Sequence, residues 1–346
     1  MLSAAYVGNR TVDLHEGAPI SPPPGHVRIR VAYVGLCGTD LHIVHGSMDR
    51  RVQTPLVFGH EMSGTIESVG EGVLGWSPGE KVTVMPLLWD GTCPACQAGN
   101  THICQNLTFI GIDSPGALQP LWNVPASTVV RLPPSADLRD AALIEPVAVA
   151  VHDVRRGEVD SGDKVVVLGG GPIGLLIATV ARDFGGDVTV VELDPTRRAL
   201  AAKLGFAALA PEAASDPSWL DEWTAGAGAD VVFEVSGAAA AVASATALAK
   251  VRGTIVQVAI HPEPRPVDLQ RIFWRELTIV GARVYERTDF DAAIELIGSG
   301  VVPTSELITR VVPLGEIQSA LGDLEGGRAM KVLVDVQAGQ PAQVPA

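Results

Sequence analysis

The sequence carries little basic charge. Its 346 residues include 25 lysines and arginines against 39 aspartates and glutamates, which gives a formal net charge of −14 at pH 7. No basic cluster interrupts this acidic excess, although binding to a nucleic-acid backbone or to an anionic membrane surface requires such clusters. We therefore expect neither a nucleic-acid partner nor a membrane-surface partner.

Long apolar runs and a secretory leader are also missing. No hydrophobic stretch approaches the roughly 20 residues that a membrane-spanning helix needs. Met1–Tyr6 lacks a charged segment followed by an apolar one, so we expect no signal peptide. Cysteine is scarce as well, and three of the four cysteines (Cys37, Cys93, Cys96 and Cys104) lie within twelve residues. This crowding favours a metal site over a disulfide framework and predicts a cytoplasmic protein.

The chain is typical of a globular protein long enough for two domains. Hydrophobic residues make up 47% of it and charged residues 18%. The first third alternates Gly- and Pro-rich turns with short apolar segments such as His26–Tyr33, Ser63–Val69 and Lys81–Met85, which predicts a mostly-β domain. From Asp137 onward helical and strand-like segments alternate, which predicts an α/β domain with a doubly wound parallel sheet.

The segments expected in the second part of the chain follow from their apolar patterns. The expected helices are Asp140–Val154, Leu175–Phe184, Ala238–Val251 and Phe290–Ile297. The expected strands are Lys164–Leu168, Val188–Val191, Asp230–Val235, Thr254–Ala259, Leu277–Val284 and Lys331–Val336. Gln337–Ala346 is expected to be a loose tail.

A histidine and a carboxylate stand side by side in Gly59–Gly64, where the flanking glycines allow the backbone to turn. Alone, His60 and Glu61 also fit an ordinary surface turn. Upstream, Cys37-Gly38-Thr39-Asp40-Leu41-His42 supplies a thiol, and thiolate, imidazole and carboxylate are all zinc ligands. A catalytic zinc keeps one position open for water or substrate, so the combination predicts a catalytic metal site.

Glu145 lies inside the apolar segment Asp140–Val154. A helix that is apolar nearly all round is buried, and a carboxylate is rarely buried without a partner. A metal ion, or water on a metal ion, is such a partner. The alternative is a glutamate at a helix end that faces solvent.

A second set of metal ligands is predicted in residues 90–104. Cys93 and Cys96 form a C-x-x-C pair, Cys104 follows, and Asp90 precedes the pair. This pattern fits a closed tetrahedral structural zinc. The alternative is a loop with unligated cysteines, and His102 is a substitute ligand.

The loop Gly169-Gly170-Gly171-Pro172-Ile173-Gly174 follows a strand-like segment and opens a helical one. Its glycines fit G-x-G-x-x-G, which points backbone N–H groups and a helix N-terminus at a pyrophosphate. Glu192 ends the next strand, where an acid accepts the ribose hydroxyls and repels a 2′-phosphate. NAD is therefore favoured over NADP, although Arg197 and Arg198 favour NADP mildly.

These three groups of residues, in this order, resemble the zinc-dependent medium-chain dehydrogenase/reductase (alcohol dehydrogenase) family over residues 1–336. The resemblance implies a GroES-like catalytic domain of residues 1–153 and 286–346, interrupted by a Rossmann NAD-binding domain of residues 154–285. Leu143-Ile144-Glu145-Pro146 is similar to the sorbitol dehydrogenase branch. Cys37–Ile43, with Asn100–Cys104, is similar to L-threonine 3-dehydrogenases.

The resemblance also implies residue roles. By position, Cys37, His60 and Glu61 match the catalytic zinc ligands. Glu145 matches the carboxylate that contacts the metal-bound water or joins the zinc ligands itself. Departures from the family pattern are Asp90, where a Cys is usual, and Ile43 and Val284, where the polyol branch has an aromatic residue and an arginine.

A proton relay is implied at the same place. Thr39 stands where the family has a hydroxyl on the substrate oxygen, and His42 resembles a later station of the relay. The implied assembly is a homodimer or homotetramer, with Leu277–Val284 as the edge strand.

The sequence thus predicts a zinc-dependent oxidoreductase for reversible NAD-linked hydride transfer between a secondary alcohol and a ketone. Polyols, vicinal diols, cyclitols and amino-alcohols are the candidate small-molecule substrates. One alternative is a zinc-independent quinone- or enoyl-type reductase of the same architecture. The other is a non-catalytic NAD-binding protein.

Overall fold

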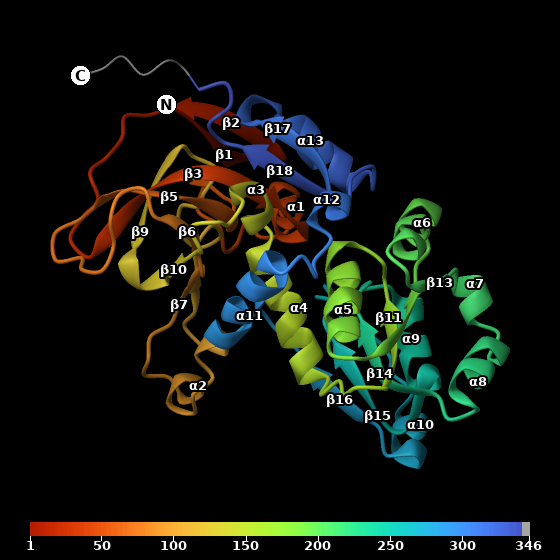
Figure 1. Cartoon of the computed structure of the whole chain (residues 1–346). Helices are drawn as coiled ribbons and strands as arrows, with labels where there is room; N and C mark the ends of the chain where they lie inside the picture. The colour runs from red at the N-terminus through yellow and green to blue at the C-terminus, as the bar shows by residue number, and fades with distance from the viewer. Residues whose placement is uncertain (341–346) are drawn as a thin grey trace. The chain divides into compact units, whose positions relative to one another are not determined.

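The computed structural model describes residues 1–340, and the chain divides into two compact units (Figure 1). Unit 1 comprises Met1–Glu145, Ala293–Gly298 and the chain from Thr304 onward. Unit 2 comprises Pro146–Ala292 and Ser299–Pro303. The divisions fall in helices α4 (Ile144–Arg156) and α11 (Arg287–Gly298). The domain boundaries suggested after residues 153 and 285 stay a prediction.

Unit 1 is built on a seven-stranded sheet in the order β10-β6-β5-β3-β18-β17, with β9 beside β3. Its strands are β3 (His26–Leu36), β5 (Glu61–Val69), β6 (Lys81–Val84), β9 (Leu121–Pro125), β10 (Val129–Arg131), β17 (Ile308–Pro313) and β18 (Lys331–Asp335). Alternate side chains of β3 are buried, as the sequence pattern predicts. Antiparallel pairing of β18 with β3 brings the C-terminal part of the chain beside the segment that leads to Cys37.

Smaller elements complete unit 1. Three strands form the sheet β2-β1-β4, and β7 pairs with β8 in a two-stranded antiparallel sheet. Their bounds are β1 (Leu2–Gly8), β2 (Thr11–Glu16), β4 (Leu56–Val57), β7 (Leu87–Leu88) and β8 (Thr108–Phe109). The helices are α1 (Gly38–Val44), α2 (Pro94–Gln97), α3 (Leu138–Ala141), α12 (Thr304–Leu307) and α13 (Ile317–Glu325), and the 3₁₀ turns are η1 (Thr101–Ile103), η2 (Ala126–Thr128) and η3 (Leu314–Glu316).

Unit 2 is a parallel sheet in the order β13-β12-β11-β14-β15-β16 (Figure 1). The strands are β11 (Lys164–Leu168), β12 (Asp187–Val191), β13 (Ala207–Leu209), β14 (Ala229–Glu234), β15 (Ala249–Gln257) and β16 (Thr278–Gly281). The connecting helices are α5 (Pro172–Asp183), α6 (Pro195–Lys203), α7 (Pro211–Ala214), α8 (Ser218–Thr224), α9 (Ala239–Leu248) and α10 (Leu269–Arg275). The central strands are buried throughout, because helices cover both faces of a doubly wound sheet. The predicted fold class is confirmed.

Two predicted helices are wrong in their extent. Ala238–Val251 was expected to be one helix, but α9 ends at Leu248 and β15 begins at Ala249. Pairing of Ala249 with Ala229 in the sheet overrides the helix preference of the alanine run. The expected helix Asp140–Val154 is broken between α3 and α4, and Pro146 lies in the first turn of α4, where its missing N–H costs nothing.

The expected loose tail Gln337–Ala346 is wrong for its described part, residues 337–340. The Gln337 side chain donates to the carbonyl of Val31, and the Gln340 side chain both donates to and accepts from the backbone of Leu2. Residues 341–346 lie outside the described part of the chain. No helix within residues 1–340 has the length and apolar character to cross a membrane.

Candidate active site

Cys37 follows β3 directly and caps helix α1. Its extended backbone (φ −131°, ψ 177°) lets Sγ accept a hydrogen bond from the N–H of Thr39 at 3.3 Å. The N–H of Cys37 in turn donates to the carboxylate of Asp40 at 2.9 Å. This reciprocal capping box fixes the direction of the thiol.

His60 and Glu61 follow a turn that requires glycine. Gly59 has φ +95°, and a Cβ there would lie 3.0 Å from the side chains of Val34 and Leu118. The turn directs both side chains inward, where they are 4% and 2% exposed. His60 Nε2 lies 3.3 Å from Cys37 Sγ.

The structure brings the predicted ligands Cys37, His60 and Glu61 together, with one donor atom of each within 4.8 Å of the others. Burial raises the pKa of the Cys37 thiol. Burial alone lowers the pKa of His60, but the adjacent Cys37 raises it well above its usual value. Thiol, imidazole and carboxylate in this geometry fit a zinc ion, which binds them in their deprotonated forms.

Asp40 lies behind His60, a proximity that the sequence did not show. Its carboxylate is 0% exposed, and Oδ1 lies 3.8 Å from His60 Nδ1. Metal-binding histidines commonly direct their second ring nitrogen at a carboxylate, which fixes the tautomer and the ring orientation. An acid in the first turn of a short helix, directly after Cys37-Gly38-Thr39, was the available signal.

Lys331 is a further residue beside the predicted metal ligands that the sequence did not reveal. Its ammonium, 3% exposed, donates to Glu61 Oε2 and to the carbonyl of Leu36. Burial alone lowers the pKa of Lys331, but the Glu61 carboxylate raises it overall. Gly35 makes room for this ion pair, since a Cβ there would lie 2.2 Å from Glu61 Oε2. The signal was a lysine at the start of an apolar strand.

The other predicted catalytic residues lie on α1 and α4. Glu145, 5% exposed in the first turn of α4, helps to raise the pKa values of His60 and Lys331. Its carboxylate is outside the group formed by Cys37, His60 and Glu61. Partly buried Thr39 and exposed His42 stand three positions apart on α1, which puts them on one helix face.

The predicted structural-zinc ligands also lie together. Asp90, Cys93, Cys96 and Cys104 each offer an atom within 4.8 Å of the others, and His102 is not among them. Two backbone N–H groups, those of Thr92 and Cys93, and the side-chain amide of Asn106 donate to the Asp90 carboxylate at 2.8, 2.9 and 2.6 Å.

These contacts fix the electrostatics of the cysteine lobe. The N–H of Cys93 and the other donors hold the pKa of Asp90 below its usual range. Burial and the neighbouring thiols raise the pKa of Cys96 to about 12. Thiols this close to one another are hard to ionise together. A bound cation would offset the charge of their thiolates. The donor set fits a closed four-ligand zinc.

The glycine loop has the geometry of a phosphate cradle. Gly169 has φ +115°, and a Cβ on Gly174 would lie 1.8 Å from the Gly169 carbonyl oxygen. Gly171 caps α5, and Pro172 fills its first turn, where Ile173 also lies. The N-terminal N–H groups of α5 are thereby left for an anion, which fits a dinucleotide pyrophosphate.

Glu192 is held against this loop at the end of β12. Its Oε2 accepts from the N–H of Gly170 at 2.6 Å, and its Oε1 accepts from the N–H of Asp194 at 2.7 Å. Arg197 Nη1 lies 3.7 Å from the position of a Cβ on Gly171, so the guanidinium borders the loop. Arg198 donates instead to the carbonyls of Glu192 and Leu193.

Comparison with known proteins gives consistent matches. Residues 23–134 match the family model of the alcohol dehydrogenase GroES-like domain, and residues 172–299 match that of the zinc-binding dehydrogenase. The chain is 51% identical to 2-dehydro-3-deoxy-L-galactonate 5-dehydrogenase of Pseudoalteromonas atlantica over 98% of this chain and 100% of that one. It is 33% identical to a sorbitol dehydrogenase of Halalkalibacterium halodurans over 90% and 93%.

A solved structure extends the match to the fold. A zinc-binding dehydrogenase from Sinorhizobium meliloti, bound to NADP, superposes with a TM-score of 0.90 at 30% identity, covering 96% of this chain and 98% of that one. The chain belongs to the zinc-dependent medium-chain alcohol dehydrogenase family. It is an oxidoreductase that uses zinc and a nicotinamide dinucleotide to oxidise small-molecule alcohols. The family assignment sets aside both the zinc-independent reductase and the non-catalytic NAD-binding protein.

Proposed function

We propose that the substrate is a 2-dehydro-3-deoxy sugar acid, oxidised at its C-5 hydroxyl to a ketone. The observation that carries this is the 51% identity to a 2-dehydro-3-deoxy-L-galactonate 5-dehydrogenase over essentially the full length of both chains. Ile43 and Val284 stand where polyol dehydrogenases have an aromatic residue and an arginine, which disfavours a plain polyol.

The test is a panel of substrates, with the rate of each reaction measured from the absorbance of the NADH formed. It contains 2-dehydro-3-deoxy-L-galactonate, sorbitol, 2,3-butanediol and L-threonine. We expect kcat/KM for the sugar acid to exceed the others by about a hundredfold, because a polar site discriminates strongly against substrates that leave its groups unpaired. A polyol or amino-alcohol turned over equally well would overturn the proposal.

The chain's own residues divide the chemistry as follows. Cys37, His60 and Glu61 would hold the catalytic zinc with Glu145 beside it, and the bound metal supplies a Lewis acid that favours the ionised alcohol. The Asp40 carboxylate, 3.8 Å from His60 Nδ1, would favour the ring orientation that ligation needs.

Proton movement falls to helix α1. Thr39 Oγ1 would accept the proton of the substrate hydroxyl while it releases its own hydrogen towards His42, which, at the exposed end of the helix, would pass a proton to solvent. Histidine suits this step, because it exchanges protons near neutral pH.

Unit 2 would hold the dinucleotide. The loop Gly169-Gly170-Gly171-Pro172-Ile173-Gly174 would take the pyrophosphate at the N-terminus of α5. The Glu192 carboxylate would accept the adenosine ribose hydroxyls, with Arg197 bordering the loop. Its negative charge favours NAD over NADP, and separate kcat/KM values for the two cofactors test this preference.

Asp90, Cys93, Cys96 and Cys104 would bind a structural zinc. Their mutual distances and the crowding of their thiols support the assignment. Inductively coupled plasma mass spectrometry of the purified protein should find about two zinc ions per chain, one catalytic and one structural. Finding only the catalytic zinc, with no change on replacing Cys96, would remove the structural site.

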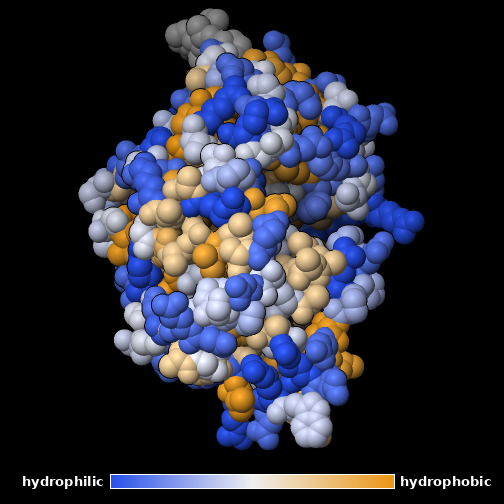
Figure 2. Space-filling model, turned by 90° about the vertical axis from the view of Figure 1, so that its right-hand side faces the viewer, coloured by the Kyte–Doolittle hydropathy of each residue, from blue (hydrophilic) through white to orange (hydrophobic). Residues whose placement is uncertain are grey.

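We also propose a cytoplasmic homodimer or homotetramer that pairs through β16. This strand lies at the end of the sheet order, so one of its edges has no strand beside it among residues 1–340. Three exposed hydrophobic residues are on this strand or on the helix that precedes it in the chain: Ile279 on β16, and Phe273 and Trp274 on α10, both 73% exposed. Apolar surface is visible at the lower end of Figure 2, at the height of α10 in Figure 1. Light scattering gives the assembly, and a purely monomeric protein would refute it.

A further inference from the structure

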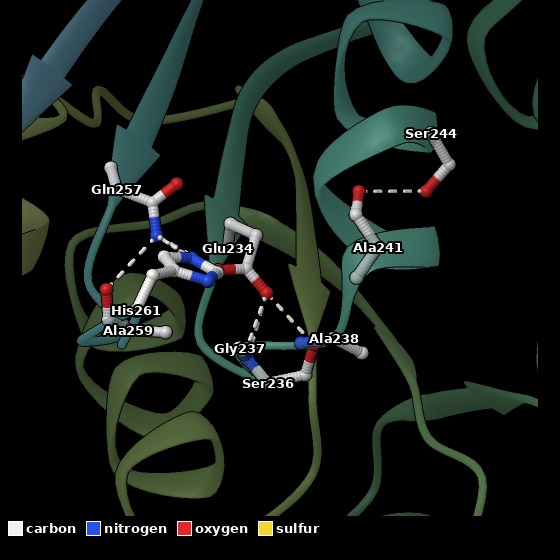
Figure 3. A network of polar contacts seen from close by, with 9 residues as sticks. All are labelled: Glu234, Ser236, Gly237, Ala238, Ala241, Ser244, Gln257, Ala259 and His261. Atoms are coloured by element: carbon white, nitrogen blue, oxygen red, sulfur yellow. Dashed lines mark hydrogen bonds and ion pairs between the residues drawn. The ribbon is translucent and has the colours of Figure 1, made fainter. Parts of the chain in front are cut away.

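A buried polar network lies at the carboxyl-terminal edge of the parallel sheet of unit 2 (Figure 3). Its centre is Glu234, the last residue of β14, which is 0% exposed. Its register partners are Leu168, which precedes the glycine loop, and Gln257, the last residue of β15. The chain passes from β11 to β12 on one side, whereas β14 lies on the other. Ligands of such sheets bind where the strand order reverses in this way.

One carboxylate oxygen of Glu234 shapes the turn that packs on the glycine loop. Oε1 accepts hydrogen bonds from Ser236 N–H (3.1 Å), Ser236 Oγ (2.8 Å) and Gly237 N–H (2.9 Å). A Cβ on Gly169 would lie 3.0 Å from the Ser236 nitrogen. The turn that Glu234 holds is therefore a wall of the dinucleotide crevice.

The other oxygen is shared by two side chains from the β15 side (Figure 3). Gln257 Nε2 donates to Glu234 Oε2 at 2.8 Å and to the carbonyl of Ala259 at 3.1 Å, which uses both of its hydrogens. His261 Nε2 lies 3.0 Å from Gln257 Nε2 and 3.3 Å from Glu234 Oε2. With both Gln257 hydrogens committed to Glu234 and Ala259, we assign the His261 tautomer that carries its proton on Nε2 and donates it to Glu234 Oε2.

This assignment makes His261 Nδ1 an acceptor. Nδ1 is buried and has no hydrogen-bond partner among residues 1–340, although the side chain as a whole is 15% exposed. A buried polar atom that is unpaired in the chain alone requires an explanation, and a hydrogen bond from a bound ligand is one that fits an atom beside a ligand crevice. Ile260, the residue before it, is 82% exposed, so this segment borders solvent.

The position of His261 selects the part of the dinucleotide. The glycine loop and Glu192 lie at the ends of β11 and β12, so the pyrophosphate and adenosine lie on that side. The nicotinamide half then extends across the reversal point towards β14 and β15. The carboxamide group of the nicotinamide has an NH2 group, which can donate the hydrogen bond that His261 Nδ1 does not receive within the chain.

We infer that His261 is a positioning residue for the nicotinamide end of the dinucleotide. Its Nε2–H is anchored on Glu234, and its Nδ1 accepts a hydrogen bond from the carboxamide N–H. This assignment goes beyond the proposed function and depends only on the part of it that places a dinucleotide in unit 2.

Calorimetric titration of the full-length protein tests the assignment without any alcohol substrate. His261→Gln keeps an amide N–H near the position of Nε2 and removes the acceptor at Nδ1. We expect its Kd for NADH to rise about fivefold, the effect of one hydrogen bond, while its Kd for ADP-ribose, which lacks nicotinamide, stays unchanged. His15→Gln, on exposed strand β2, is the matched control. Equal weakening of both ligands, or no weakening, overturns the inference.

A cofactor analogue tests the proposed hydrogen bond itself. Reduced 3-acetylpyridine adenine dinucleotide has a methyl ketone in place of the carboxamide, so it has no N–H to donate. We expect the wild-type preference for NADH over this analogue to shrink in His261→Gln and to be largely retained in His261→Asn, whose amide oxygen lies near Nδ1. A preference that is the same in all three proteins refutes the role of Nδ1. Failure of the sugar-acid panel leaves these binding results untouched, so the two proposals fail separately.

Discussion

Replacing Lys331 with methionine should expose how Glu61 is balanced. In the metal-free protein the substitution leaves the Glu61 carboxylate, 2% exposed, without its cation. Removing one partner of a buried ion pair costs about 3–5 kcal/mol, and the carbonyl of Leu36 also loses a donor, which adds about 1 kcal/mol. Methionine fills the volume of the lysine stem, so little packing is lost. We expect a total loss of about 4–6 kcal/mol without metal.

Zinc should reduce this loss. A divalent cation beside Glu61 replaces the missing ammonium, so with zinc the destabilisation should fall to about 1–2 kcal/mol. Urea unfolding followed by circular dichroism, with saturating zinc and with a chelator, measures both values. Lys164→Met is the matched control, because the exposed Lys164–Asp187 pair should contribute about 1 kcal/mol or less in either condition. Equal losses with and without zinc would show that Glu61 does not face the metal.

Further predictions concern four other residues. Cys96→Ser should lose about one zinc ion per chain, measured by metal analysis, and should have a lower melting temperature, measured by calorimetry. Unchanged zinc content and melting temperature would contradict the structural zinc site. Burial and the nearby Asp289 raise the pKa of Asp153 in the folded protein. As pH rises, Asp153 therefore ionises in the unfolded chain before it does so in the folded one. The folded state is destabilised by this difference above about pH 4, the usual pKa of an aspartate. Asp153→Asn should therefore unfold at higher urea at pH 7 but not at about pH 3, and equal midpoints at pH 7 would exclude this cost. Glu192→Ser should lower the ratio of kcat/KM for NAD to kcat/KM for NADP by about tenfold. An unchanged ratio would show that Glu192 does not discriminate between the two cofactors. His42→Gln should slow turnover by about tenfold to a hundredfold at neutral pH with partial rescue by imidazole, and full activity would exclude the relay.

The sequence was sufficient where residue type and local spacing carry the chemistry. Cys37 and the His60–Glu61 pair lie in short motifs whose glycines mark the turns, and the structure places their donor atoms together. The glycine loop is equally local, because a strand, a turn and a helix start specify it within a few residues. The order of strands and helices therefore revealed the fold class.

Long-range partners were not readable in the same way. Lys331 and Glu61 are 270 positions apart, and their contact depends on the register in which β18 pairs with β3. A slip of that register by a single residue would turn Lys331 to the other face of the sheet. The alanine run before β15 misled for a related reason, because sheet pairing at Ala249 outweighs a local helix preference.

Two buried glutamates show what such long-range contacts contribute. Glu61 is balanced by a full positive charge, whereas Glu234 is surrounded by N–H and O–H donors from its own turn and from β15. A carboxylate in an ion pair can exchange one cation for another. Glu61 can therefore shift from the Lys331 ammonium to a metal ion when the metal binds. A carboxylate held by fixed dipoles has no such exchange to make and instead fixes the geometry around it. The first arrangement suits a metal centre that must accept and retain a cation, and the second suits the wall of a crevice whose shape must stay constant while the dinucleotide enters and leaves.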